Sequence, residues 1–119
     1  MIIYKKYYFF IKNIINNINL IKGNNVKIID IRKQVNNLFS FFIICEGISN
    51  LHIKTIYYKI ILSINKDYNI NPYNIEGINN YNWVLIDYKF LIVNIFLKKI
   101  RYYYNIDTLF KKYPVINIT

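Results

Sequence analysis

Two apolar segments that almost adjoin, residues 82–88 and 90–97, constrain the fold of this chain most strongly. Both have the length of a β-strand and are rich in the branched and aromatic residues that pack well on a pleated sheet. The turn between them falls at Tyr88-Lys89 or Lys89-Phe90, so the pair predicts a hairpin of adjacent antiparallel strands. A hairpin this apolar requires a sheet with other elements packed on it.

Further strand and helix patterns occupy the rest of the chain. Short apolar or β-branched runs predict strands at 26–31 and 41–46 and a short edge strand at 75–78. Apolar residues at helical spacing predict helices at 4–21, where Ile11, Ile14, Ile15, Ile18 and Ile21 form the stripe, and at 51–66. A closing helix is predicted at 99–111, and Pro114 lies beyond its end.

This order of elements predicts an α/β (α+β) fold with a small mixed β-sheet of four to five strands and helices packed on it. A length of 119 residues corresponds to one domain. We divide that domain into an N-terminal helix (1–24), a core (26–111) and a tail (112–119) in which no further element is expected. A connection is expected at 32–37.

The formal net charge of +10 permits two explanations. A strong positive charge is typical of proteins with a phosphate-rich partner or an anionic surface to bind. Fourteen Lys against two Arg, no Ala, and many Ile, Asn, Tyr and Phe instead indicate an AT-rich genome, in which lysine accumulates by mutational drift. Composition alone leaves both explanations open.

Cysteine usage and hydropathy indicate the compartment. Cys45 is single and lies in an apolar run, which predicts a small buried residue and excludes a disulfide framework. The apolar start of the chain, residues 1–15, is interrupted by lysines and lacks a cleavage signal. No stretch approaches the roughly 18 apolar residues that a membrane span needs. We expect a soluble cytoplasmic protein with no membrane contact, and an organelle-targeted one is the alternative.

The chain's only Trp lies on a strand whose two faces differ. With a period of two, Trp83, Leu85 and Asp87 share one face, while Val84, Ile86 and Tyr88 share the other. If the Val84 face is core, the first face presents an indole, an aliphatic group and a carboxylate, which is a composition typical of protein interfaces. A purely structural Trp is the alternative.

Arg101 and Tyr104 lie three residues apart and are expected on one face of the closing helix. Because Arg101 is one of two arginines in a lysine-rich chain, its retention indicates bidentate pairing, with Asp87 or Asp107 as the candidate carboxylate. We include Arg101 and Tyr104 among the candidate partner-binding residues.

Ser49 and His52 follow a strand at a predicted strand-to-helix junction. A nucleophile and base with Asp87 or Asp30 as the third member is one interpretation, and a helix cap with a first-turn histidine is the other. We favour the cap, because there is no Gly-x-Ser-x-Gly elbow and no second His. A metal-dependent transferase needs clustered carboxylates, and the six acidic residues include no Asp-x-Asp pair. We therefore expect no catalytic residue, no metal and no cofactor.

Residues 26–110 together carry a family resemblance. The matching features are Val26-Lys27-Ile28-Ile29-Asp30, a strand followed by Gly47-x-Ser49-x-x-His52, then Glu76-Gly77, the Trp83 strand ending in Asp87, a second strand, and Arg101-x-x-Tyr104-x-Ile106-x-x-Leu109-Phe110. In this order and spacing the chain resembles the ribosomal silencing factors of the Iojap family. It departs from their pattern at Asn94, where the family has His, and at Lys89-Phe90, where the family has a Gly-Asp turn.

The resemblance implies a fold, a role and a partner. It implies a nucleotidyltransferase-like architecture used without catalysis. Silencing factors bind ribosomal protein L fourteen of the large ribosomal subunit and block joining of the small subunit, which represses translation. The region of Trp83, Leu85 and Asp87 is implied as the partner-binding surface.

The same resemblance implies a family-motif surface at Gly47, Ser49, His52, Glu76 and Gly77. Two alternative functions stay open: a ribosome assembly factor that contacts rRNA directly and, least favoured, a nucleotidyltransferase-like enzyme. Assembly into a homodimer off the ribosome also stays open.

Overall fold

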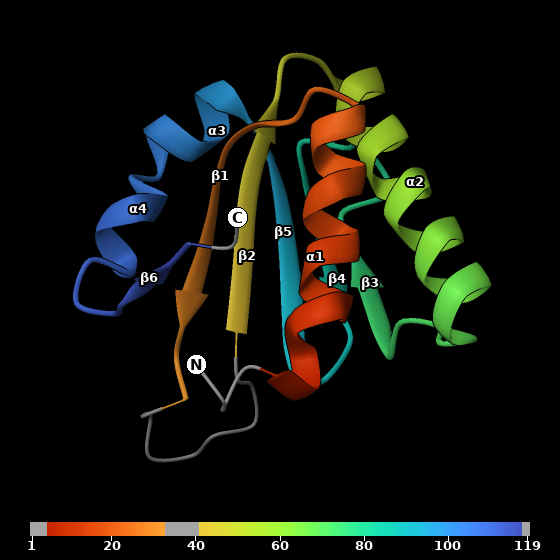
Figure 1. Ribbon diagram of the computed structural model, residues 1–119. Coiled ribbons are helices and arrows are strands. Elements are labelled where there is room, and N and C mark those ends of the chain that lie inside the picture. Colours follow the sequence, from red (N-terminus) through yellow and green to blue (C-terminus); the bar gives the residue numbers. More distant parts are fainter. Residues whose placement is uncertain (1–4, 33–40, 118–119) are drawn as a thin grey trace.

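In the computed structural model, which describes residues 5–32 and 41–117, a six-stranded mixed sheet is covered by helices on both faces (Figure 1). The helices are α1 (Lys5–Leu20), α2 (Asn50–Tyr68), α3 (Lys98–Tyr103) and α4 (Ile106–Leu109). The strands are β1 (Asn24–Asp30), β2 (Phe41–Gly47), β3 (Asn74–Glu76), β4 (Trp83–Asp87), β5 (Leu91–Leu97) and β6 (Val115–Ile116). The connection predicted at 32–37 lies mostly outside the described residues.

The strand order is β3-β4-β5-β2-β1-β6. Strands β2 and β5 are parallel, with Phe41 opposite Leu91, and lie in the middle of the sheet. The other neighbouring pairs of described strands are antiparallel, including the predicted β4–β5 hairpin, in which Leu85 is opposite Asn94. The predicted mixed sheet is confirmed, although it has six strands where four to five were expected.

The main core lies between the sheet and the pair α1–α2, which pack on the same face. The predicted stripe is confirmed on α1, where Ile11, Ile14 and Ile18 are buried and Ile15 is partly buried. Ile21, also partly buried, lies in the turn that follows α1. Cys45 lies in this core as predicted, and burial raises the pKa of its thiol to about 12. No helix in the described ranges is both long and apolar enough to span a bilayer.

A second, smaller core lies on the other face. Strands β1, β2 and β5 contribute Ile29, Ile44 and Phe96, and Ile106 of α4 closes over them. In Figure 1, α3 and α4 lie beside β1 and β6, away from β3 and β4. The described helices therefore cover only one end of this face of the sheet.

Two predictions for the C-terminal region are wrong. The helix expected at 99–111 is two short helices, because Asn105 takes a left-handed conformation (φ 51°, ψ 48°) that ends the first and starts the second. The tail expected to lack structure contains β6, which pairs with Ile28 and Ile29 of β1.

Candidate functional site

At the end of the second sheet face that no described helix covers, six side chains form what we call the open half: five are partly or fully exposed, and Asn94 is buried and bonded to Trp83. They are Asn74 and Glu76 of β3, Trp83, Leu85 and Asp87 of β4, and Asn94 of β5. Val84 and Ile86 point into the main core, so the predicted division of β4 into a buried and a partly open face is confirmed.

Trp83 is fixed in place while much of its surface stays accessible. Its ring packs against Phe96 with a centroid separation of 4.8 Å, and its Nε1 donates a hydrogen bond to Asn94 Oδ1 at 3.0 Å. The residue is nevertheless 39% exposed. An indole held by two contacts loses little conformational freedom on binding, which favours its use as an anchor.

Gly77 and Glu76 belong to the same surface. Gly77 has φ of 89°, and a Cβ there would lie 1.9 Å from the Trp83 carbonyl oxygen, so only glycine allows this approach. The turn is closed by Tyr81 N, which donates to Gly77 O at 3.0 Å. Gly77 thereby brings Glu76 into register with Leu85 on the open half.

The open half is acidic in a basic protein. Glu76 accepts a hydrogen bond from Asn74 Nδ2 at 3.0 Å, and Asp87 accepts one from Lys89 N at 2.7 Å. Among the side chains that the structure describes, those of residues 7–32 and 41–117, neither carboxylate has an ion-pair partner. The six side chains of the open half include no Lys or Arg, so the surface is suited to a basic partner.

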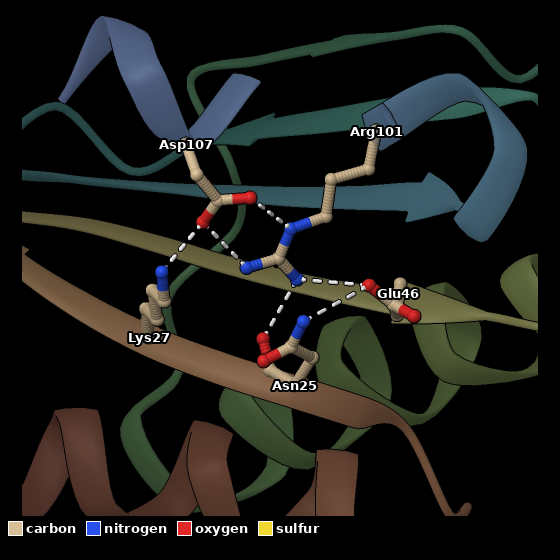
Figure 2. Close-up of polar contacts among 5 residues, drawn as sticks. All are labelled: Asn25, Lys27, Glu46, Arg101 and Asp107. Atoms are coloured by element: carbon tan, nitrogen blue, oxygen red, sulfur yellow. Dashed lines mark hydrogen bonds and ion pairs between the residues drawn. The ribbon is translucent and has the colours of Figure 1, made fainter. Parts of the chain in front are cut away.

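Arg101 is not on this surface. Its side chain is 2% exposed and binds Asp107 through two nitrogens, Nε at 3.0 Å and Nη2 at 2.9 Å (Figure 2). Its Nη1 donates to Asn25 O at 2.7 Å and to Glu46 Oε1 at 3.3 Å. The predicted bidentate pairing is present, with Asp107 and not Asp87 as the carboxylate.

Lys27 completes this network, since its Nζ lies 2.8 Å from Asp107 Oδ1 (Figure 2). The hydrogen bonds from Arg101 are the main reason that the pKa of Asp107 is lowered from 3.8 to about 2, and Lys27 adds to the shift. We call the five residues Asn25, Lys27, Glu46, Arg101 and Asp107 the arginine network. It joins β1, β2, α3 and α4, so its geometry indicates a role in stabilising the fold.

Tyr104 lies apart from Arg101. Tyr104 is 56% exposed and is the C-cap of α3, with its backbone N donating to Ile100 O. The expectation that Arg101 and Tyr104 share one helix face is wrong, because α3 ends at Tyr103 and one of the two side chains is buried.

Gly47, Ser49 and His52 build the start of α2. Ser49 Oγ accepts from His52 N at 3.0 Å, which confirms the predicted N-cap. The His52 ring accepts from Ile48 N through Nδ1 at 3.0 Å, which leaves Nε2 to donate to Ile21 O at 2.6 Å. A Cβ on Gly47 would lie 2.8 Å from Ile53 Cδ1 and 2.9 Å from His52 Nδ1. Both ring nitrogens thus bind backbone, and Ser49 bonds the His52 backbone instead of its ring.

Asn94 and Phe96, which hold Trp83, were missed as site residues. Asn94 is the one polar residue of Leu91–Leu97, and a lone amide in an otherwise apolar strand could have indicated a buried hydrogen-bond partner. Phe96 gave no such signal. Among the described residues, no three His, Cys, Asp or Glu side chains lie close enough to hold a metal ion.

Comparisons with known proteins agree with these features. The profile of the family described as "Ribosomal silencing factor during starvation" (RsfS) matches residues 10–119. A Halalkalibacterium halodurans protein named ribosomal silencing factor RsfS is 29% identical over 86 residues, covering 72% of this chain and 73% of that protein. Its Bacillus subtilis counterpart is 30% identical over 78 residues, covering 66% of this chain and 65% of its own.

Two solved structures share the fold. A crystal structure from Chromobacterium violaceum superposes with a TM-score of 0.76 at 26% identity and covers 91% of this chain and 89% of its own. One from Bacillus halodurans has a TM-score of 0.77 at 26% identity and covers 92% and 97%. The chain belongs to the ribosomal silencing factor family.

Proposed function

We propose that this protein binds ribosomal protein L fourteen of the large ribosomal subunit through its open half. The bound protein then blocks joining of the small subunit and represses translation. It acts by binding alone, in the cytoplasm where subunits join, and needs no cofactor. The family membership and the accessible, fixed indole of Trp83 support this proposal.

The chemistry of the open half suits this partner. Proteins that contact rRNA are rich in Lys and Arg, because they neutralise phosphate. Glu76 and Asp87 provide carboxylates for such a surface, and Trp83 with Leu85 provides the apolar centre. An interface of ordinary size, about 800 Å² per partner, is sufficient if it covers a position that the small subunit must occupy.

The test is binding to isolated large subunits, followed by a subunit-joining assay based on light scattering. Wild-type protein should co-sediment with large subunits and reduce joining in proportion to occupancy. We expect Trp83→Ala to lower affinity about 30-fold, which corresponds to about 2 kcal/mol for a central aromatic residue.

Phe9→Ala is the matched control, because Phe9 is an exposed aromatic residue on α1, which packs on the opposite sheet face. It should bind and silence as wild type does. Unchanged binding of folded Trp83→Ala would contradict the proposal. Light scattering on the free protein distinguishes a monomer from the alternative of a homodimer off the ribosome.

An rRNA-contacting assembly factor is the second candidate function. Two lysines in a cleft beside α2, Lys98 and Lys99, favour it.

A further inference from the structure

A cleft of about 600 Å³ opens where the parallel strands β2 and β5 end, between the start of α2 and helix α3. We call it the α2–α3 cleft. Its walls are formed by Ile48, Ser49, Asn50, Leu97, Lys98, Lys99 and Tyr102. None of these residues belongs to the open half or to the arginine network, so the cleft is a separate feature.

The α2–α3 cleft is positively charged. Lys98 and Lys99 are exposed, and within the part of the chain that the structure describes neither forms an ion pair. No Asp or Glu lines the cleft. Glu46, on the strand that leads into the cleft, is buried and already bound to Arg101. The positive charge of the two lysines is therefore not compensated by a carboxylate in the cleft, and this charge favours an anionic occupant.

Tyr102 adds an aromatic surface to this charge. It is 67% exposed, and its ring contacts no other ring of the described residues. Tyr103 and Tyr104 follow it and are 80% and 56% exposed, so three consecutive aromatic side chains lie at the surface. Exposed tyrosines beside lysines are the combination by which proteins stack unpaired bases while neutralising the backbone.

We propose that the α2–α3 cleft binds a single-stranded segment of RNA. Lys98 and Lys99 contact its phosphates, and a base stacks on Tyr102. A single strand fits better than a duplex, because paired bases are already stacked inside the helix and cannot reach a tyrosine ring. An acidic peptide would match the lysines but would leave the tyrosine without a role. The RNA proposal does not depend on the open half.

The experiment is fluorescence anisotropy of a labelled twelve-nucleotide oligouridylate titrated with the purified protein. Wild-type affinity should fall steeply with salt, because phosphate binding releases counterions. The double variant Lys98→Glu/Lys99→Glu should bind at least about tenfold more weakly at 0.1 M salt. Tyr102→Ala should bind about five- to tenfold more weakly, and Tyr102→Phe should restore affinity since it keeps the ring.

The matched control is Lys54→Glu/Lys59→Glu, which makes the same change in net charge on the exposed side of α2. Its affinity should stay within about twofold of wild type, because these lysines lie outside the cleft. Equal losses in the two double variants, or no loss in Tyr102→Ala, would overturn the proposal and leave only a diffuse positive charge. Equal competition by polyglutamate and unlabelled oligouridylate would also overturn it.

The RNA proposal and the proposed function can fail separately. Trp83→Ala should retain oligouridylate binding, and the cleft variants should retain binding to purified ribosomal protein L fourteen. Loss of oligouridylate binding in Trp83→Ala would show that the RNA lies on the open half instead, which contradicts the cleft as its site.

Discussion

One face of the sheet has two halves with opposite properties. In the covered half, α3 and α4 bury Ile29, Ile44 and Phe96, and Arg101 is bonded to carboxylates on two other elements. In the open half, Trp83 is accessible and Glu76 and Asp87 have no ion-pair partner among the described residues. Arg101 and Trp83 belong to the same family motif but have different roles. Arg101 stabilises the fold, and Trp83 is accessible to a partner.

Loss of Arg101 should have the largest effect on the covered half. Arg101→Ala removes the main partner of the buried Glu46, whose side chain is 6% exposed. Breaking a buried ion pair on one side typically costs about 3–5 kcal/mol in the free energy of unfolding. Urea unfolding measures the loss, and Lys99→Ala on the same helix is the control, expected within about 0.5 kcal/mol of wild type. A loss below about 1 kcal/mol in Arg101→Ala would mean that the network does not hold the covered half.

Trp83→Ala should lower the free energy of unfolding by about 1–2 kcal/mol, less than the about 3–5 kcal/mol of a fully buried Trp. The reason is that the indole is 39% exposed and is held by Asn94 and Phe96 alone among the contacts described. The same urea titration decides the outcome. A loss as large as that of Arg101→Ala would place Trp83 in the core and remove the distinction between the two halves.

Charge reversal in the open half should leave stability nearly unchanged and reduce binding. We expect Glu76→Lys and Asp87→Lys each to lower affinity for the large subunit by about 1 kcal/mol, mostly through slower association. Stopped-flow association at two salt concentrations measures this. The control is Lys66→Glu, because Lys66 is an exposed residue at the end of α2. Faster association of the two lysine variants would contradict a basic partner.

The smallest expected effect is the pH dependence of the Asp107 contact. The pKa of Asp107 is about 2 in the folded protein and 3.8 without its partners, so the contact adds stability above pH 3.8 and loses it as the pH falls through about 2. The difference in thermal midpoint between wild type and Asp107→Asn should therefore be constant near neutral pH and shrink below pH 3.8. A difference as large at pH 2 as at neutral pH would refute this assignment.

The sequence predicted the regular parts of the fold because they carry strong local patterns. The stripe on α1, the cap at Ser49 and the alternation in β4 each depend on residues within one element. The prediction of one closing helix is wrong because the apolar spacing continues past Tyr104, while a single left-handed residue, Asn105, divides the segment into two helices. The two-residue strand β6 is too short to leave a pattern, and its pairing with β1 is decided by tertiary contacts.

Only the part of the site that follows from the alternation of residues along one strand was predictable from the sequence. The face of Trp83, Leu85 and Asp87 follows from a period of two, and pairing of Arg101 with Asp107 was one of two alternatives. Asn25 and Glu46, by contrast, reach Arg101 from distant parts of the chain, and nothing in their local sequence indicates that contact. Burial of Arg101 follows from those contacts, so its structural role could not be separated from a binding role beforehand.

The parallel pairing of β2 with β5 has a consequence for the order of folding. Phe41 finds its partner Leu91 only after α2, β3 and β4 have been made, so the inner edge of β2 stays unpaired while the ribosome synthesises the intervening chain. That edge belongs to a strand that is almost entirely buried in the finished protein, including Ile43 and Ile44. Exposed apolar strand edges pair readily with other chains. We therefore expect the nascent protein to be most prone to aggregation just before β5 emerges, because pairing with β5 covers this edge of β2.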